Sequence, residues 1–184
     1  MNMKLLKIIE LFCHHSLILH EILIQEDAIF QDMSTFNFWF AMSETKSSIK
    51  MHPKHVVVVM RAGLPMRYQN SYRLESKNPF NREQAEKILI EVMEDNFSKY
   101  DRFDAKTDVD LCQKVSEDVL KLMKEKRFDR YRIIVIVTIV EKFMQGIHYK
   151  QKNLWDSRKD CSVTHVYKAA SFTAIGNCYG VYLE

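Results

Sequence analysis

The chain has 184 residues, enough for one folded domain with a proper core and an extension beyond it. Its 27 Lys and Arg residues nearly balance its 24 Asp and Glu residues, so the net charge of +3 lacks the basic excess of a nucleic-acid-binding protein. The four cysteines form no CxxC pair, which argues against a zinc cage or a disulfide framework and indicates a reducing compartment.

Apolar residues recur at near-helical spacing through residues 1–24. Charged and histidine residues interrupt them, so the segment contains neither the run of about 18 apolar residues that crosses a membrane nor the unbroken core of a signal peptide. We therefore expect a cytosolic chain without an integral membrane segment. The spacing predicts an amphipathic docking helix, with a poorly ordered extension or an upstream start codon as the alternative. The apolar positions are Leu5, Ile8, Ile9, Phe12, Leu19, Ile22 and Leu23.

The folded domain is expected to begin after a change in sequence character near Pro65. An aromatic run at residues 36–40 and a β-prone run at residues 56–60 precede it. We therefore divide the chain into residues 1–66, an N-terminal extension that is partly disordered or a docking helix, and residues 67–184, the folded domain.

Two amphipathic helices are predicted next. Asn81 and Gln84, three residues apart, form a capping box at the start of the first helix, and the second begins around Thr107. Lysine and arginine residues near the end of the second helix suit the helix dipole. The apolar stripes are Ala85, Ile88, Leu89, Val92, Met93 and Phe97 in the first helix, and Leu111, Val115, Val119, Leu122 and Met123 in the second.

Four strands are predicted after the helices. A β-branched run at residues 131–140 is typical of a central strand covered on both faces. After a turn at Gly146, residues 147–154 form a more polar strand, residues 161–170 a third and residues 172–183 a fourth. Helices segregated from a four-stranded antiparallel sheet give an α+β fold.

The junctions between these elements carry distinctive short runs. They are Asn70-Ser71-Tyr72-Arg73-Leu74, Pro79-Phe80, Arg130-Tyr131-Arg132-Ile133-Ile134-Val135, Gln145-Gly146-Ile147, Leu154-Trp155-Asp156 with Asp160, and Tyr179-Gly180-Val181-Tyr182-Leu183-Glu184. Together they resemble the Tctex-type dynein light chain family, over residues 70–184. The extension of about 65 residues is similar to that of the longer members, several of them linked to axonemal or ciliary dynein.

The resemblance implies a strand-swapped homodimer, or a heterodimer with another Tctex-type light chain. The second strand, residues 147–154, would cross to the sheet of the partner. Its polar centre, around Lys150 and Lys152, independently suits a strand that does not lie in the middle of its own sheet. The expected dimer-interface residues are Ile147, Tyr149, Gln151, Leu154 and Trp155. Packing at a junction or interface is expected for Trp155, with peptide contact as the alternative.

The resemblance also implies that a segment of a dynein intermediate chain adds to the edge of the third strand through backbone hydrogen bonds. The expected peptide-binding residues are Ser162, Val163, Thr164, His165, Val166, Tyr167 and Lys168. The function expected is therefore that of a light chain or adaptor in the cytoplasm and on the cytoskeleton, with the cilium or axoneme left open. The alternative is a cargo- or membrane-tethering adaptor that uses the N-terminal amphipathic segment.

No enzymatic site is predicted. Cys161 and His165 share a strand face but lie about 13 Å apart along it, too far for a nucleophile and its base. Asp156 and Asp160 lack the further oxygen ligands of a calcium loop, and no glycine-rich phosphate loop occurs. We therefore expect no catalytic residue, metal or cofactor. A basic cluster could meet an acidic peptide or a membrane, or it is a hydrated helix end; it comprises Lys124, Lys126, Arg127, Arg130 and Arg132.

Overall fold

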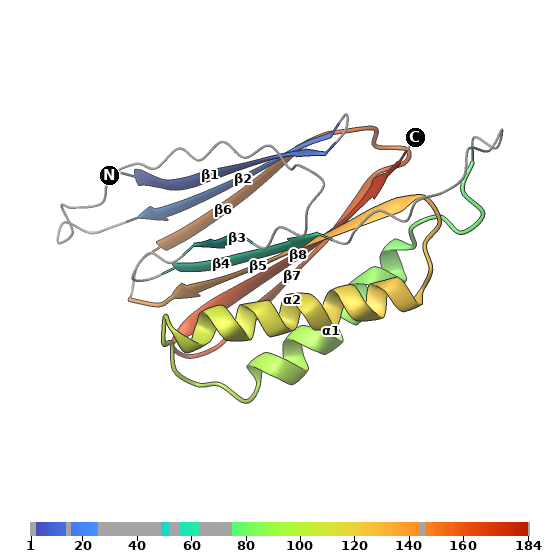
Figure 1. Ribbon diagram of the computed structural model, residues 1–184. Coiled ribbons are helices and arrows are strands. Elements are labelled where there is room, and N and C mark those ends of the chain that lie inside the picture. The colour runs from blue at the N-terminus through green and yellow to red at the C-terminus, as the bar shows by residue number, and fades with distance from the viewer. Residues whose placement is uncertain are drawn as a thin grey trace. The chain divides into compact units, whose positions relative to one another are not determined.

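Two helices and five antiparallel strands form the larger of two structural units (Figure 1). The computed structural model describes residues 3–13, 16–25, 49–51, 56–62, 75–143 and 146–183, with side chains in residues 57–62, 75–143 and 147–183. The elements are β1 (Met3–Cys13), β2 (Ser16–Gln25), β3 (Ile49–Met51), β4 (Val56–Ala62), α1 (Arg82–Phe97), α2 (Thr107–Glu125), β5 (Tyr131–Glu141), β6 (Gly146–Leu154), β7 (Cys161–Lys168) and β8 (Phe172–Tyr182).

The larger unit confirms the α+β prediction. Its sheet has the order β3-β4-β5-β8-β7, and both helices cover one face of it (Figure 1). Both predicted helices and all four predicted strands, β5 to β8, are present. The predicted start of α1 is also confirmed, because the side chain of Asn81 accepts a hydrogen bond from the backbone N–H of Gln84 at 3.1 Å.

The smaller unit corrects the prediction of an N-terminal docking helix. β1 and β2 are strands, and together with β6 they form a three-stranded antiparallel sheet in the order β1-β2-β6. The segment is rich in isoleucine, a β-branched residue that favours strands, and short apolar runs do not separate helix from strand by spacing alone. The amphipathic helix behind the tethering alternative is therefore absent from these residues.

β4 extends the sheet of the larger unit ahead of the boundary expected at residue 67. It pairs with β5 in unbroken register from Val56↔Val140 to Ala62↔Ile134, and Arg61 forms an ion pair with Glu117 of α2. β8 pairs with one edge of β5. The β-prone run at residues 56–60 pairs with the other edge, which satisfies its backbone groups. The aromatic run at residues 36–40 and the junction at residues 70–74 lie outside the described residues.

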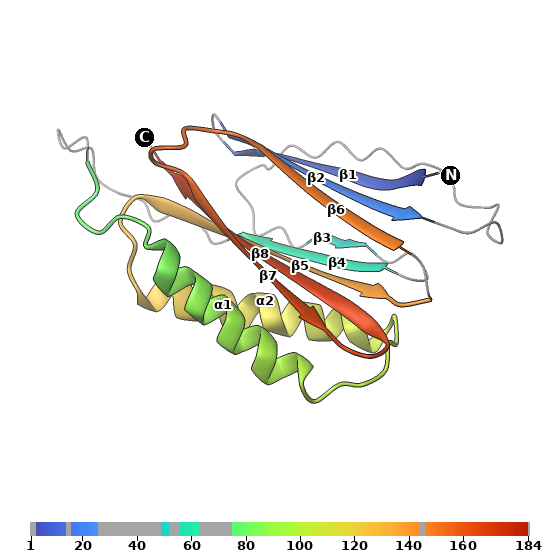
Figure 2. The same ribbon diagram turned by 180° about the vertical axis from the view of Figure 1, so that it is seen from behind.

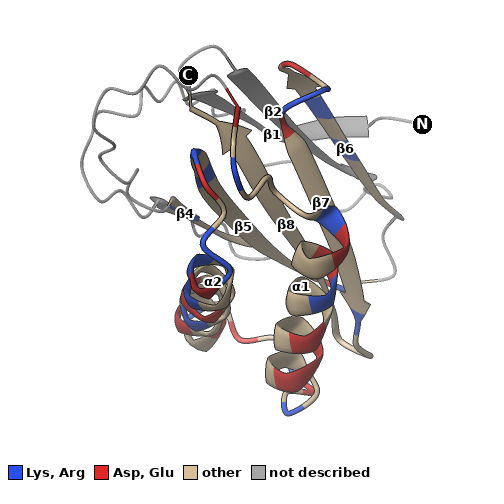
Figure 3. Cartoon of the chain, turned by 90° about the vertical axis from the view of Figure 1, so that its right-hand side faces the viewer, with Lys and Arg blue, Asp and Glu red and all other residues tan. Residues whose placement is uncertain are grey.

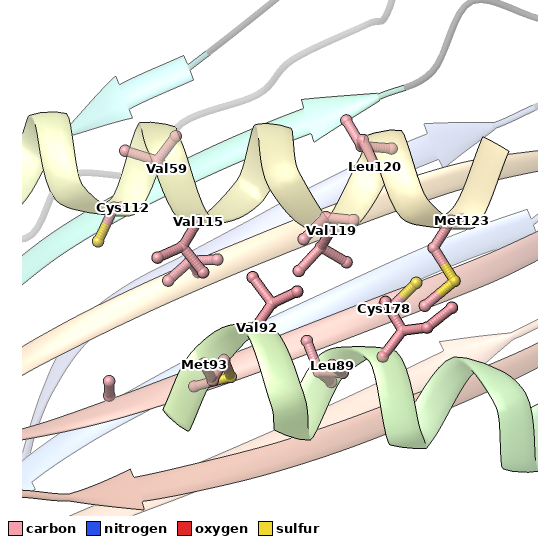
Figure 4. Close-up of a cluster of buried hydrophobic side chains, with 14 of the residues drawn as sticks. Val59, Leu89, Val92, Met93, Cys112, Val115, Val119, Leu120, Met123 and Cys178 are labelled. Carbon is pink, nitrogen blue, oxygen red and sulfur yellow. The ribbon is translucent and has the colours of Figure 1, made fainter. Parts of the chain in front are cut away.

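The core lies between the helices and the sheet. Figure 4 shows side chains of α1 and α2 meeting over the strands, with Cys112 and Cys178 among them. The predicted stripes are buried, except for Leu122, which is half-buried. Complete burial raises the pKa of the Cys178 thiol to about 12, so this cysteine serves as a packing residue.

The opposite face of the same sheet is also buried along β5 and β8. Ile134 and Ile136 of β5 and Tyr179 of β8 have side chains with no exposed surface, although they do not belong to the helix-facing core. The prediction of a central strand covered on both faces is therefore confirmed for β5, in which every residue from Ile133 to Val140 is buried.

Two glycines let α1 and the residues before it approach β8 closely. Figure 2 shows α1 lying beneath β7 and β8. A Cβ atom at Gly176 would lie 2.2 Å from the sulfur of Met93, and one at Gly180 would lie 2.5 Å from the ring of Phe80. That ring is held between other aromatic side chains, with centroids 5.0 Å from Phe128 and 5.9 Å from Tyr131. A side chain at Gly180 would displace the ring of Phe80, and one at Gly176 would displace the flexible end of Met93.

Substituting Gly180 by Ala should therefore destabilise the fold by about 1–3 kcal/mol, because the added methyl group overpacks the contact with Phe80. Thermal or denaturant unfolding of the full chain measures this loss. The double variant Gly180→Ala with Phe80→Leu should recover part of it, since a smaller side chain then faces the methyl group. A single variant as stable as the parent protein would contradict the close contact.

Asp108 makes folding stability depend on pH. Its side chain is 3% exposed in the first turn of α2, and burial raises the pKa of its carboxyl from 3.8 to about 6. The N–H of Asp104, which donates to Oδ2 of Asp108 at 3.1 Å, opposes this shift, whereas the charges of Asp104 and Glu141 add to it. The folded state thus holds this proton more tightly than the unfolded state does.

Stability contributed by protonated Asp108 should therefore be present below about pH 4 and lost as the pH rises through about 6. Asp108→Asn keeps an oxygen acceptor for the N–H of Asp104 but cannot ionise. Denaturant unfolding between pH 4 and pH 7 should show a flatter profile for this variant and a gain over the parent protein at pH 7. Asp110→Asn, an exposed change in the same helical turn, controls for the loss of one charge. Parallel profiles for the parent and Asp108→Asn would refute the assignment.

Candidate functional site

β7 is the last strand of its sheet and offers an open backbone edge. It pairs with β8 through eight residue pairs, from Cys161↔Gly180 to Lys168↔Thr173, and no strand of the described residues pairs with its other edge. All the predicted peptide-binding residues lie in this strand: Ser162, Val163, Thr164, His165, Val166, Tyr167 and Lys168. The structure thus brings them together on a sheet edge, the position from which strand addition is possible.

The two faces of β7 have different tasks. Val163 is buried in the core, and the ring of Tyr167 stacks on Phe97 with centroids 5.8 Å apart. On the other face, Thr164, Val166 and Lys168 are exposed, and the hydroxyl of Thr164 donates to Oδ1 of Asn177 at 2.8 Å. The helix-facing side chains therefore anchor the strand, while those of the other face can meet a partner.

β7 carries few of the devices that protect sheet edges. It contains no proline, its pairing with β8 has no register shift, and its one lysine stands at the C-terminal end. Natural edge strands are usually blunted by such features or by a covering segment. The outer edge of β7 is therefore chemically able to receive an extended chain.

β6 does not pair with either strand that is adjacent to it in the sequence. It pairs with β2 through nine residue pairs, from Leu17↔Leu154 to Gln25↔Gly146. Consecutive strands are usually neighbours in a sheet, and only residues 155–160 separate β6 from β7. Because β6 belongs to the three-stranded sheet, it does not lie beside the outer edge of β7.

The predicted interface residues of β6 do not share one face. Ile147, Tyr149 and Gln151 are half-buried, as is Trp155 after the strand, whereas Leu154 is 62% exposed and alternates with them. Leu154 therefore lies on the same side as Lys150 and Lys152. A single flat contact would not involve all five predicted residues.

The chain that enters β7 is fixed to the ends of β5 and β8. The hydroxyl of Tyr131 donates to the carbonyl oxygen of Lys159 at 3.0 Å, and the N–H of Tyr182 donates to Oδ1 of Asp160 at 2.8 Å. The ammonium of Lys159 also lies 4.9 Å from the ring centroid of Tyr182. Asp160 thus has a structural role in the β6–β7 connection.

Two features of the described residues bear on catalytic and metal chemistry. Burial raises the pKa of the Cys161 thiol, although Arg82 opposes the shift, and a raised pKa is the reverse of what a nucleophilic cysteine needs. Within the same residues, no three His, Cys, Asp or Glu side chains gather in a way that could hold a metal ion. None of the described helices has the length and hydropathy needed to cross a membrane.

The predicted basic cluster runs from the last turn of α2 through the connection to the start of β5. The side chain of Asn78 donates to the carbonyl oxygens of Lys126 and Arg127 at 2.9 and 3.1 Å, and Arg127 and Arg130 adopt left-handed backbone conformations with φ of 52° and 63°. Acidic and basic residues alternate along α2, so the helix presents no uniform basic face (Figure 3). The backbone of this cluster therefore has a structural task at the end of the helix.

The sequence did not predict two strand pairings, that of β2 with β6 and that of β4 with β5. The β-prone run at residues 56–60 was a signal for β4. No comparable signal identified β6 as the partner of β2, because strand pairing joins residues far apart in the sequence.

Comparison with known proteins gives the same family from two directions. The profile of the Tctex-1 family matches residues 79–181. Dynein light chain Tctex-type 5-B of Xenopus laevis is 25% identical over 149 residues, which cover 78% of this chain and 83% of that protein. Human Dynein light chain Tctex-type 5 is 27% identical over 121 residues, with 66% and 67% covered, and human Dynein light chain Tctex-type protein 2 is 25% identical over 119 residues, with 65% and 60% covered.

The Xenopus alignment covers 78% of the 184 residues, so even an alignment that ends at the last residue must include β4. This agrees with the position of β4 in the sheet of the larger unit. The family profile itself spans both helices and the strands β5 to β7, with nearly all of β8. Because this match takes in more than half of the chain, the chain belongs to the Tctex-1 family.

Proposed function

We propose that this chain is a non-catalytic dynein light chain that dimerises and binds an extended segment of a dynein intermediate chain by strand addition on β7. One observation carries the proposal: the outer edge of β7 has no strand beside it in the described chain, although β6 is only six residues away in sequence. The relatives are named dynein light chains, which supports the choice of motor. The chain would act in the cytoplasm on the cytoskeleton, and kinship with longer family members extends this to the cilium or axoneme.

In the proposed dimer, β6 of each copy would cross to the sheet of the other, and the exchange would be reciprocal under twofold symmetry. Ile147, Tyr149, Gln151, Leu154 and Trp155 would then lie at or near the interface. Another light chain of the Tctex type could take the place of the second copy.

The intermediate-chain segment would bind on β7 near the interface of this dimer. Dimerisation and peptide binding would then be coupled equilibria, so saturating peptide should change the dimerisation constant. Sedimentation of the full chain with and without peptide measures that coupling.

Proline substitution at two adjacent positions tests the edge. Successive N–H groups of a strand point to opposite edges, so one of Thr164→Pro and His165→Pro removes a bond to β8, while the other removes only an outward donor. We expect the first variant to melt at a lower temperature and the second to remain folded but lose intermediate-chain peptide binding in calorimetric titration. If the fold-sparing variant binds the peptide as the parent protein does, the ligand lies elsewhere.

Trp155→Ala tests the crossing strand. The indole is half-buried directly after β6, and tryptophan is enriched among the interface residues whose truncation costs more than about 1 kcal/mol of association. The variant should therefore dissociate at a concentration several-fold higher than the parent protein in sedimentation experiments. Leu154→Ala, on the other face of β6, is the matched comparison. Unchanged dissociation of the Trp155 variant would remove this residue from the interface.

A further inference from the structure

One edge of β6 is occupied by β2, a strand from the distant N-terminal part of the chain. The pairing runs without a register shift through nine residue pairs, from Leu17↔Leu154 to Gln25↔Gly146. Its two strands are separated by more than a hundred residues, so no short loop forces them together. β2 thus adds to β6 as a tethered extended segment would add to a sheet edge.

β1 forms the outer edge of the β1–β2 hairpin, and that edge is protected against the addition of another strand. The pairing of β1 with β2 shifts register between Leu5 and Lys7, which marks a bulge or irregularity, and lysines occur at positions 4 and 7. Bulges and lysines are common means of preventing further strands from adding. The hairpin therefore replaces the edge of β6 by one that is less receptive.

We infer that the β2-paired edge of β6 is a strand-binding site, that the N-terminal hairpin β1–β2 is its resident occupant, and that an extended segment from another protein can bind there only when the hairpin leaves. The class of ligand follows from β2 itself, which is an extended segment with six aliphatic residues, Leu17, Ile18, Leu19, Ile22, Leu23 and Ile24. Because a tethered strand acts at a high effective concentration, a free segment of equal intrinsic affinity is excluded while the hairpin is in place.

This inference goes beyond the proposed function, because it concerns an edge other than that of β7. In a dimer formed by exchange of β6, the hairpin would accompany β6 to the partner. Each copy would then bring an internal competitor for any strand that seeks the far edge of β6. The N-terminal extension would in this way regulate how many strand ligands one light-chain dimer accepts.

The test uses three forms of the full chain and a fluorescent peptide of residues 16–25 with a solubilising lysine tag. In the release form, His20→Pro and Glu21→Pro remove one N–H donor toward each neighbour of β2. In the locked form, Glu21→Cys and Lys150→Cys replace residues that are cross-strand partners, and their backbones are close enough for a disulfide. The parent protein is the third form.

We expect the release form to bind the peptide at least tenfold more tightly than the oxidised locked form, with the parent protein in between, and reduction of the locked form to restore the parent value. Glu21→Cys with Lys152→Cys, which are out of register by two residues, should crosslink less efficiently than the in-register pair. Equal peptide binding by the release and oxidised locked forms would overturn the inference. So would no binding by a release form whose far-ultraviolet circular dichroism shows that the helices are folded.

An intermediate-chain peptide added as a competitor separates this inference from the proposed function. Competition in the release form would show that the same ligand class enters at β6. Binding of the competitor to the parent protein without displacement of the fluorescent peptide would leave the β7 site and the β6 site as distinct. Failure of the intermediate-chain peptide to bind any form would refute the proposed function, while the outcome for the fluorescent peptide would still decide the occupancy of β6.

Discussion

Each strand of a sheet must satisfy the backbone groups on both of its edges, and the architecture of this chain follows from how that requirement is met. β5 lies between β4 and β8, and β8 lies between β5 and β7, so the two strands with the longest buried runs are paired on both sides. β2 likewise lies between β1 and β6. β7 stands at one end of its sheet, so the backbone groups of its outer edge have no strand beside them in the described chain. The functional proposal starts from that edge because a partner can supply what the chain itself does not.

The helix layer makes β7 a stable platform. Gly176 and Gly180 allow α1 and Phe80 to lie close to β8, and from there Phe97 of α1 contacts Tyr167 of β7. Val163 adds a buried anchor nearer the start of the strand. An edge strand fixed along one face in this way loses little conformational freedom when a ligand adds to it, which lowers the entropic cost of binding.

The extension ahead of α1 changes which sheet edges are available for partners. β4 covers the outer edge of β5, and β2 covers one edge of β6. Both strands come from the region that the sequence reading had assigned to an extension, and both pair with strands that follow the helices. Without these strands, β5 and β6 would present those edges themselves, whereas here the outermost strands on those sides are β3 and β1. The extension thus changes which strands a partner can reach, and its removal from an edge becomes a means of control.

Local signals in the sequence determined the helices and the most apolar strands. Asn81 caps α1 through a hydrogen bond to Gln84, three residues later. The apolar stripes of both helices repeat with the helical period. The run from Ile133 to Val140 is apolar enough to be buried on both faces. The junction residues were sufficient for the family and hence for the α+β fold.

Only the tertiary structure decided which strands lie side by side. The segment of β1 and β2 has apolar spacing that suits either a helix or a strand, and the choice was made by pairing with β6, which lies more than a hundred residues away. The same holds for β4, whose partner β5 follows both helices. Which edges remain open, and therefore where a partner can add, depends on all of these pairings at once. Backbone hydrogen bonds between strands carry no residue code, so a sequence states the tendency to form a strand but not its neighbour.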